Sequence, residues 1–278
     1  MIDAGSNRAV QDGIRRVYDE ASDYYRQLRW EKNRLARFEY DLTRQTIEEE
    51  LGASVGERGL ELGCGPGTWT PLLVSRTRGV TAVDISGGML EQARKALASE
   101  PVTFVQGDAA AAPIEGEFDR AMSIRMLEYT PEWAKIVARL GDLVVPGGRA
   151  VVITKTKVSV WRGTGRERWF VTYPRRLARF LIKGPRRRDF WQRHIPVRAM
   201  IAALRDAGFT EIRVRPVIFG LPIFMRGTKQ YPIVPEFLEM PVLRAEGAVW
   251  RWVSKRGPAL RWASLLFSES YAVSARKV

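Results

Sequence analysis

The sequence is poor in the residues that build cysteine- or histidine-based sites. It contains a single cysteine, Cys64, and a single histidine, His194. One cysteine cannot close an intrachain disulfide, so a disulfide-stapled secreted module is excluded and a reducing compartment is expected. One cysteine and one histidine are also too few for a Cys/His zinc or iron site. We therefore expect no metal centre.

Long apolar runs are missing as well. No stretch approaches the roughly 18 consecutive apolar residues that a membrane span needs, and the N-terminal residues MIDAGSNRAVQDGIRR lack the apolar segment of a signal peptide. The chain has 278 residues, of which 45% are hydrophobic, and this suits one large globular domain with a real core. We expect a cytoplasmic protein, with peripheral attachment to a membrane left open.

Acidic residues are scarce in the second half of the chain. Residues 156–278 carry 25 Lys and Arg against 8 Asp and Glu, a net charge of +17, whereas residues 1–155 carry a net charge of −3. The net charge of +14 for the whole chain therefore comes from the second half. Its most basic part, residues 157–198, interleaves 13 Lys and Arg with aromatic residues. Nucleic acid, an anionic membrane surface and an acidic small molecule are the candidate partners.

Predicted strands and helices alternate along the middle of the chain. The first 50 residues have the apolar spacing of helices, and Gly52 and Gly56 end that pattern. Pro131 is placed to open a helix, and residues 144–148 are expected to form a turn. The expected strands are 59–62, 80–83, 102–105, 118–123 and 150–154, with helices at 68–76, 86–97 and 131–143. This alternation predicts βαβ units and a parallel sheet covered on both faces.

The last part of the chain is expected to complete the sheet. A helix at 196–207 and a strand at 211–217 are followed by an alternating strand at 271–275, which suits an antiparallel sheet edge. The predicted fold is α/β, with a doubly wound, Rossmann-like, mostly parallel seven-stranded sheet. Its expected parts are an N-terminal helical cap (1–55), a core (56–155), a basic aromatic insertion (156–195) and the remainder of the core (196–278), with a second insertion at 219–267. The two insertions are expected to form a lid.

A glycine-rich turn follows the first predicted strand. The residues Leu60-Glu61-Leu62-Gly63-Cys64-Gly65-Pro66-Gly67 run from this strand into the next helix. Glycine allows a positive φ and lets a ligand touch the backbone, and the helix N-terminus favours a negatively charged group. Asp84 ends the second strand nineteen residues after Gly65, where a carboxylate can accept hydrogen bonds from ribose hydroxyls. Asp108 follows the third strand and is placed to reach an adenine amino group.

Together these motifs resemble those of the class I S-adenosylmethionine-dependent methyltransferases, in particular the small-molecule branch related to the ubiquinone and menaquinone methyltransferases. The matching segments are ELGCGPG (61–67), VDIS (83–86), GDA (107–109), FD (118–119), LEY (127–129), PGG (146–148) and AGF (207–209). The resemblance covers residues 56–155 and, in part, 196–217. It implies S-adenosylmethionine as the cofactor and leaves the acceptor open. A nicotinamide dehydrogenase fits less well, because the G-x-G-x-x-G spacing is absent.

The resemblance also implies which residues surround the cofactor. Glu61 would order the glycine loop, Asp84 would bind the ribose, and Asp108 would frame the adenine. Residues after the fourth strand would lie beside the methionine part of S-adenosylmethionine. The implied set is Glu61, Gly63, Cys64, Gly65, Gly67, Asp84, Ile85, Asp108, Ala109, Ile124 and Arg125. Within this set, we interpret Cys64 as a small space-filling residue rather than a nucleophile.

Three side chains are candidates for the catalytic base. His194 precedes the helix at 196–207, at the end of the first insertion, where such folds place a lid. Tyr129 and Glu128 belong to Leu-Glu-Tyr at 127–129, where relatives often have Leu-Glu-His, so a role of that histidine would pass to Tyr129 or be absent. A base with a pKa near neutral pH helps an oxygen or nitrogen acceptor to lose its proton. The alternative for each of the three is a structural role.

The expected activity is methyl transfer to a small molecule. Oxygen is the favoured acceptor atom, with nitrogen and carbon as alternatives. The acceptor is expected to be lipophilic or anionic and amphipathic, because tryptophan and arginine around short apolar segments suit a membrane interface. A lipid acceptor and an anionic membrane surface are therefore the expected partners. The alternatives are an RNA-modifying methyltransferase, since aromatic and basic surfaces also bind RNA, and a non-catalytic cofactor-binding scaffold. The oligomeric state is left open.

Overall fold

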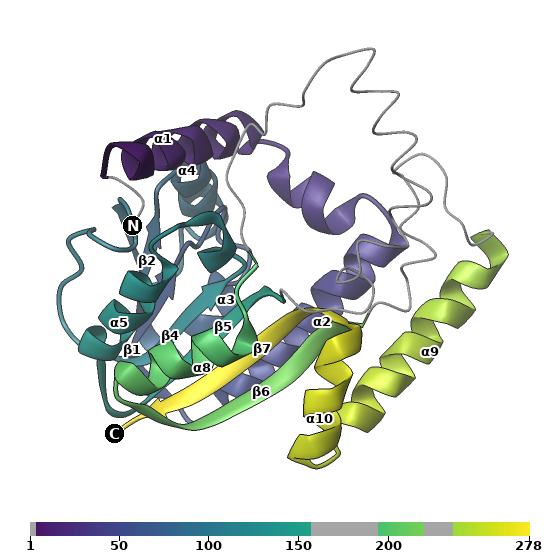
Figure 1. Ribbon diagram of the computed structural model, residues 1–278. Helices are drawn as coiled ribbons and strands as arrows, with labels where there is room; N and C mark the ends of the chain where they lie inside the picture. The colour runs from purple at the N-terminus through teal and green to yellow at the C-terminus, as the bar shows by residue number, and fades with distance from the viewer. Residues whose placement is uncertain (1–3, 157–193, 220–235) are drawn as a thin grey trace.

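A seven-stranded sheet forms the centre of the structure. The computed structural model describes residues 4–156, 194–219 and 236–278, and Figure 1 shows helices on both faces of the sheet. The strands are β1 (Gly56–Leu62), β2 (Thr77–Asp84), β3 (Val102–Gln106), β4 (Phe118–Ile124), β5 (Val144–Lys155), β6 (Phe209–Phe219) and β7 (Ser268–Lys277). Their order is β3-β2-β1-β4-β5-β7-β6, with β1 to β5 parallel and β7 antiparallel to both of its neighbours. The predicted doubly wound, mostly parallel α/β sheet is confirmed.

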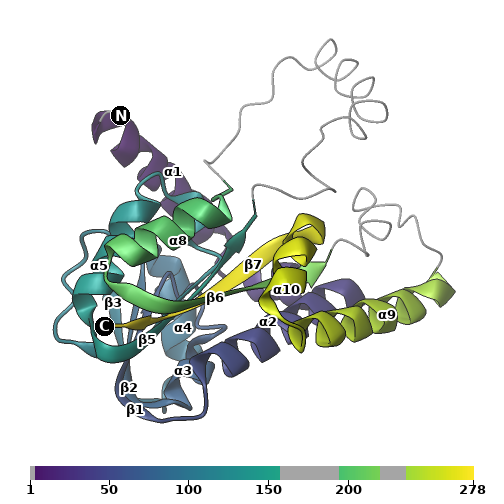
Figure 2. The same cartoon turned by 60° about the horizontal axis from the view of Figure 1, so that its bottom comes forward.

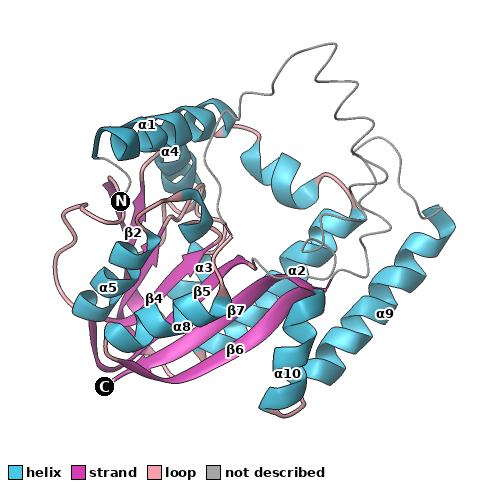
Figure 3. Cartoon of the chain, viewed as in Figure 1, coloured by secondary structure: helices cyan, strands magenta, loops and turns pink. Residues whose placement is uncertain are grey.

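Helices connect most of the strands, as the secondary-structure colouring of Figure 3 shows. They are α1 (Ala4–Ala21), α2 (Arg34–Leu51), α3 (Thr70–Val74), α4 (Gly87–Ala96), α5 (Trp133–Leu143), α8 (Val197–Asp206), α9 (Glu236–Ser254) and α10 (Pro258–Ser264). Side-chain caps fix two of the starting points, because the first N–H groups of a helix lack helical partners. Asn33 Oδ1 accepts a hydrogen bond from Ala36 N at 2.8 Å before α2, and Ser86 Oγ accepts one from Met89 N at 3.1 Å before α4.

Two apolar clusters, one on each face of the sheet, make up most of the core. Leu60 and Leu62 of β1 belong to the cluster that includes buried residues of α5 and α8. The other cluster includes Ile47 of α2 and Leu73 of α3. Since neighbouring side chains of a strand point to opposite faces, Glu61 points to the same face as α3. The alternation along β1 thus places a carboxyl group beneath the glycine turn.

The position of β7 differs from the prediction. The last strand is antiparallel, as expected, but it lies between β5 and β6, and β6 forms the sheet edge. The side chains of residues 271–275 are all buried, with Tyr271 and Ala272 fully so. The residues of a strand that is buried on both faces do not indicate which strands lie beside it. The alternating pattern at 271–275 therefore did not show whether this strand lies at the edge of the sheet or inside it.

Two local predictions on either side of α5 are wrong. Pro131 lies in the turn before the helix, and α5 begins two residues later, at Trp133. Residues 144–148 do not form a separate turn, because β5 already starts at Val144. The register of β5 against β4 shifts within these residues, so the glycines there form an irregularity inside the strand.

The chain before β1 is helical in three pieces. Helix α1 lies against α4, a short π-helical segment η1 (Gln27–Glu31) follows, and α2 packs against β5, β6 and β7. In Figure 1 α1 crosses the molecule above the strand ends, whereas α2 runs behind β6 and β7. The N-terminal region therefore contributes both to the core and to the cover of the strand ends.

The expected lid is only partly described. Most of the basic insertion at 156–195, namely 157–193, lies outside the described residues. Within the second insertion, α9 packs against α2 and β6, and α10 packs against β6 and α9. In Figures 1 and 2 these two helices lie away from α1. The described part of the second insertion is therefore not a lid over the strand ends.

Candidate active site

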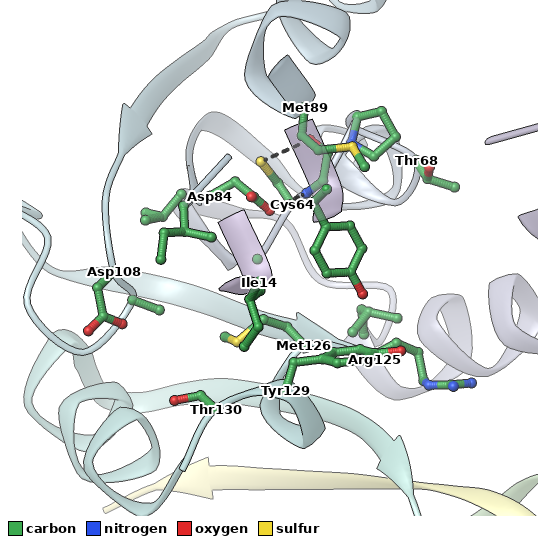
Figure 4. A pocket seen from close by; sticks show the side chains of 18 of the residues that line it. Ile14, Cys64, Thr68, Asp84, Met89, Asp108, Arg125, Met126, Tyr129 and Thr130 are labelled. Atoms are coloured by element: carbon green, nitrogen blue, oxygen red, sulfur yellow. Dashed lines mark hydrogen bonds between the residues drawn. The ribbon is translucent and has the colours of Figure 1, made fainter. Parts of the chain in front are cut away.

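A cavity of about 930 Å³, partly open to solvent, lies where the carboxyl ends of β1 to β4 meet (Figure 4). This is the place where open parallel sheets bind their ligands. Its walls come from α1, from residues 25–30 and from the loops after these strands. The polar and aromatic residues of its lining include Gln11, Tyr18, Tyr25, Trp30, Thr68, Trp69, Asp84, Asp108, Arg125, Tyr129 and Thr130.

The glycine loop forms one wall of this cavity. Gly63 and Gly65 have φ angles of 77° and 54°, which glycine adopts without strain. A Cβ atom on Gly63 would lie 2.3 Å from Met126 Cγ, whereas a Cβ atom on Gly65 would meet nothing within 4 Å. Gly63 is therefore required by packing. At Gly65, which lines the cavity, the absent side chain leaves the backbone open to a ligand.

Asp84, at the end of β2, presents a fixed carboxylate to the cavity. Its Oδ2 accepts a hydrogen bond from Gly65 N at 2.7 Å, and its Oδ1 accepts one from Ser86 N at 2.9 Å. Burial raises the pKa of Asp84, and these backbone donors act against the increase. Each carboxylate oxygen can accept a second hydrogen bond, so the group can still bind two donors of a ligand.

Asp108 connects the cavity to α1. Its Oδ1 accepts a hydrogen bond from Ala110 N at 3.0 Å, and its Oδ2 accepts one from Gln11 Nε2 at 2.6 Å. Further along α1, Asp19 Oδ1 accepts hydrogen bonds from Ser86 Oγ at 2.5 Å and from Gly88 N at 3.1 Å. Helix α1 is thus fastened to loops on both sides of the cavity.

A buried ion pair supports the wall after β4. Arg125 Nε lies 2.7 Å from Glu128 Oε1, and Thr154 Oγ1 donates a hydrogen bond to Glu128 Oε2 at 2.8 Å. Burial alone would lower the pKa of Arg125, but the Glu128 carboxylate raises it above its ordinary value. Arg125 also has a φ of 61°, an uncommon conformation for a residue other than glycine. The ion pair therefore holds a charged, conformationally strained residue at the cavity wall.

Three tyrosines, one of them on α1, line one side of the cavity. The ring of Tyr18 lies edge-to-face with the rings of Tyr25 and Tyr129, at centroid distances of 5.8 Å in both cases. Burial raises the pKa of all three hydroxyl groups, that of Tyr25 to about 12. At neutral pH all three hydroxyl groups are therefore protonated, and a hydrogen bond joins those of Tyr18 and Tyr129.

Glu61 lies behind the glycine loop as a buried carboxyl group. Its Oε2 accepts a hydrogen bond from Thr70 Oγ1 at 2.6 Å, and its Oε1 has no hydrogen-bond partner among the described residues. Burial raises the pKa of Glu61 from 4.5 to about 8, whereas the Thr70 hydroxyl acts against this increase. Cys64, in the loop above, is also buried, and burial raises the pKa of its thiol. The thiol therefore remains protonated, as expected for a residue that fills space.

Glu61→Gln should change how stability depends on pH. Because the folded pKa is raised, the carboxyl group of the native protein loses its stabilising contribution as the pH rises from 4.5 to about 8. Glutamine cannot ionise. Across this interval the free energy of unfolding of the variant, relative to the native protein, should rise by up to about 1.4 kcal/mol per pH unit. Urea denaturation at several pH values measures this difference, and Glu57→Gln, an exposed position on β1, is the matched control. A pH-independent difference for Glu61→Gln would contradict the assignment.

Most of the residues predicted to bind the cofactor come together in the cavity. Those that line it are Gly63, Cys64, Gly65, Asp84, Ile85, Asp108, Ala109, Ile124 and Arg125. Two others do not line it. Glu61 is fully buried beneath the loop, and Gly67 faces the core, where a Cβ atom would lie 2.9 Å from Leu97 Cδ1. For these two residues the structure indicates support of the loop rather than contact with a ligand.

Of the three catalytic candidates, only Tyr129 lines the cavity. Glu128 is fully buried, and its two carboxylate oxygens are engaged by Arg125 and Thr154. These contacts fit a role of Glu128 in positioning Arg125, and its catalytic role stays a prediction. His194 is half-buried beside Ile195, which forms a bridge with Thr156, and it is not a lining residue.

A helical cap at 1–55 was predicted, but the residues of α1 that line the cavity were not. Gln11, Ile14 and Tyr18 all line the cavity, and Tyr25 and Trp30 follow them. The first three are spaced three and four residues apart, which places them on one face of a helix. That spacing was the available signal, but the sequence does not indicate what this face covers.

The comparisons with known proteins agree with this geometry. Residues 60–148 match the family described as a methyltransferase domain. The matched residues contain the glycine loop, Asp84 and Asp108, and the sheet order is that of the fold shared with solved S-adenosylmethionine-dependent methyltransferases. The chain is similar to the demethylmenaquinone methyltransferase of Staphylococcus aureus (strain JH9), with 31% identity over 153 residues. The alignment covers 53% of this chain and 62% of the relative, so the chain matches less than two thirds of the relative's length.

Solved structures share the fold at low sequence identity. The magnesium protoporphyrin IX methyltransferase of Synechocystis PCC 6803, solved with bound S-adenosylmethionine, has a TM-score of 0.57 and 14% identity, over 96% of this chain and 97% of that chain. The [4+2]-cyclase SpnF has a TM-score of 0.58 and 18% identity, over 96% of this chain and 97% of that chain. These likenesses show the fold alone, and the second comes from a protein named for a different reaction.

Proposed function

We propose that the protein transfers a methyl group from S-adenosylmethionine to an oxygen atom of a small, lipophilic or anionic amphipathic acceptor. The observation that carries this proposal is the cavity in which the open backbone of Gly65 lies together with the carboxylates of Asp84 and Asp108. The methyltransferase-domain match covers all three residues. The name of the Staphylococcus aureus relative, which refers to demethylmenaquinone, supports a small-molecule acceptor.

The lining residues fit the cofactor. A Cβ atom at Gly65 would fill part of the cavity, and its absence leaves the room that a bound nucleoside needs. In our proposal Asp84 accepts hydrogen bonds from the ribose hydroxyls, and Asp108 accepts one from the adenine amino group. The amide of Gln11 now donates to Asp108, so this carboxylate already binds an NH₂ group. Ile124 and Arg125 are proposed to border the methionine half.

The acceptor side is assigned to the aromatic residues. Tyr18, Tyr25, Trp30 and Tyr129 line the cavity, and none of them is required for the proposed cofactor contacts. Aromatic side chains offer flat apolar surface, and tyrosine adds a hydroxyl donor at its rim. An acceptor with an apolar ring or chain and one polar oxygen would match both properties.

The proposed methyl transfer requires mainly that the protein aligns the cofactor and the acceptor. The bound cofactor supplies a methyl group that is already activated by the positive sulfur. Holding two reactants in line can contribute about 7–11 kcal/mol towards the barrier. The glycine loop, Asp84 and the tyrosine group are therefore proposed to fix the geometry and to keep water away from the reacting atoms.

The proton balance favours an acidic acceptor. The three tyrosines stay protonated at neutral pH, because burial raises their pKa values. Asp84 and Asp108 accept backbone hydrogen bonds and are assigned to the cofactor. Among the described lining residues, no side chain then remains to take a proton from the acceptor. We therefore propose a carboxylic acid or an acidic phenol, whose anionic oxygen accepts a hydrogen bond from a tyrosine hydroxyl.

A transfer assay with tritium-labelled S-adenosylmethionine tests this function. The acceptors are alkyl-substituted aromatic carboxylic acids, phenols and amines of matched size. We expect labelled product from acids or phenols and none from amines. Mild alkali releases a methyl ester as volatile methanol, whereas methyl ethers and methylated amines keep the label. Label on nitrogen or carbon would overturn the proposed atom, and cofactor binding without transfer to any acceptor class would overturn the proposed reaction.

Tyr129→Phe should lower kcat about tenfold and leave the affinity for the cofactor unchanged, because it removes one hydroxyl donor, which contributes roughly 1–1.5 kcal/mol. Tyr24→Phe is the matched control, since Tyr24 is exposed and does not line the cavity. Equal kcat values for the two variants would exclude Tyr129 from the acceptor site.

A further inference from the structure

Helix α9 has an exposed side that the fold does not use. We call this side the α9 outer face and include the two residues that follow the helix. It consists of Phe237, Leu238, Met240, Arg244, Val249, Arg251, Trp252, Lys255 and Arg256, all of which are exposed. In Figures 1 and 2 α9 lies at the outside of the molecule. The side chains of the α9 outer face therefore keep a large part of their surface in contact with water.

The opposite side of α9 packs against the rest of the protein. Leu243, Trp250 and Val253 are buried, and the last two pack with Leu42 of α2. Trp250 Nε1 also donates a hydrogen bond to Pro216 O of β6 at 3.2 Å. Their spacing of seven and three residues is that of one helical face. Docking of α9 on α2 and β6 is thus complete without the α9 outer face.

Basic residues outnumber acidic residues in this region. Residues 237–267 contain five Lys and Arg and only two acidic residues, Glu239 and Glu246. Glu246 is fully buried, and Glu239 is partly shielded, with its Oε2 3.6 Å from Arg34 Nη1. The exposed charges of the α9 outer face are therefore all positive.

Large apolar side chains accompany these charges. Phe237 is 77% exposed and Trp252 is 51% exposed, and the guanidinium of Arg256 lies 4.7 Å from the ring of Trp252. The neighbouring helix α10 and the turn after it expose Trp262, Leu266 and Phe267. Single exposed apolar residues are common on proteins, but a helix that exposes several of them among cations marks an interaction surface.

We propose that the α9 outer face docks on the surface of an anionic phospholipid bilayer. Helices with aromatic and aliphatic residues among Lys and Arg lie in the membrane interface, with their apolar side chains at the boundary of headgroups and acyl chains. Each basic residue near such a surface contributes about 1 kcal/mol, so four cations act together with the apolar contacts. No helix within the described ranges is long and apolar enough to cross a membrane, so the proposed docking is peripheral.

The composition of the surface favours a bilayer over the two other occupants that it could suggest. RNA would neutralise the cations and stack on Trp252, but it would leave the aliphatic side chains of Leu238, Met240 and Val249 in water. A second copy of the chain would bring the same cations into opposition across a twofold axis, and like charges repel. Of these three occupants, the headgroup and acyl layers of an anionic bilayer are the one that satisfies both kinds of side chain. This inference does not depend on the proposed methyl transfer.

Vesicle sedimentation of the full chain tests the proposal. The vesicles are phosphatidylcholine alone or phosphatidylcholine mixed with phosphatidylserine, at low and high salt. We expect binding to the anionic vesicles that decreases as salt screens the charges. Arg251→Gln with Lys255→Gln, and separately Phe237→Ser with Trp252→Ser, should each weaken this binding about tenfold or more.

Matched variants separate the α9 outer face from the other basic parts of the chain. Arg78→Gln with Lys135→Gln removes two exposed cations elsewhere, and Leu28→Ser with Val55→Ser removes two exposed apolar side chains. Both control variants should bind vesicles as the native chain does. Vesicle binding that survives both α9 variants would overturn the proposal. So would RNA binding, or dimer formation measured by sedimentation velocity, that the α9 variants abolish while vesicle binding is absent.

Discussion

Asp84→Ala should weaken the binding of S-adenosylmethionine by about 100-fold or more. The carboxylate lines the cavity and is oriented by Gly65 N and Ser86 N, at 2.7 and 2.9 Å. Hydrogen bonds that involve a charged group contribute roughly 1.5–3 kcal/mol each, and the proposed pair of ribose hydroxyls forms two of them. Isothermal titration calorimetry of the native chain and the variant measures the loss directly.

A second aspartate provides the matched control for this experiment. Asp119 Oδ2 also accepts hydrogen bonds from two backbone N–H groups, those of Glu57 and Arg58, both at 2.9 Å, but Asp119 does not line the cavity. Asp119→Ala should therefore lower the stability of the fold without changing the affinity for the cofactor. If both variants bind the cofactor like the native chain, Asp84 has no role in its binding.

Glu128→Gln should destabilise the fold by roughly 3–5 kcal/mol, because it leaves the buried guanidinium of Arg125 without a counter-charge. The two groups are 2.7 Å apart, with side-chain exposures of 12% and 0%, so water cannot replace the lost carboxylate. Urea denaturation gives the free energy of unfolding. Glu31→Gln removes one partner of the exposed Arg26–Glu31 pair and should cost less than about 1 kcal/mol.

A double variant shows whether the cost arises from the unpaired charge. Adding Arg125→Leu to Glu128→Gln removes the buried cation, so the combined loss should be smaller than the sum of the two single losses. Strict additivity of the two changes would mean that the pair is not coupled, which would contradict the positioning role of Glu128.

The parallel part of the fold could be predicted because its signals are local. Each strand from β1 to β4 is a short apolar run that ends in a recognisable loop, and a parallel sheet brings the ends of such strands to one edge. Gly65, Asp84 and Asp108 could therefore be placed together before the structure was known. The order of β6 and β7 depends on pairing between distant segments, and no residue of 271–275 indicates its neighbours.

The remaining wall of the site depends on tertiary contacts. Gln11 lies 97 residues before Asp108, and only the docking of α1 brings them together. Adjacent residues can also diverge: Tyr129 reaches the cavity, whereas Glu128 points into the core towards Thr154. The short 3₁₀ turn Leu127–Tyr129 makes this separation, which the sequence motif alone could not show.

The hydrogen bonds that hold α1 in place couple the docking of this helix to the binding of the cofactor. Gln11 and Asp19 of α1, with Asp23 in the turn after it, bind Asp108, Ser86 and Gln92, which belong to the matched segment at 60–148. That shared domain is consequently not a complete binding unit, because one side of its cavity is supplied by residues that precede it. The effect of cofactor binding on the docking of α1 must then equal, in free energy, the effect of α1 docking on the affinity for the cofactor. Substitutions on α1 that touch no ligand would therefore change the affinity for it.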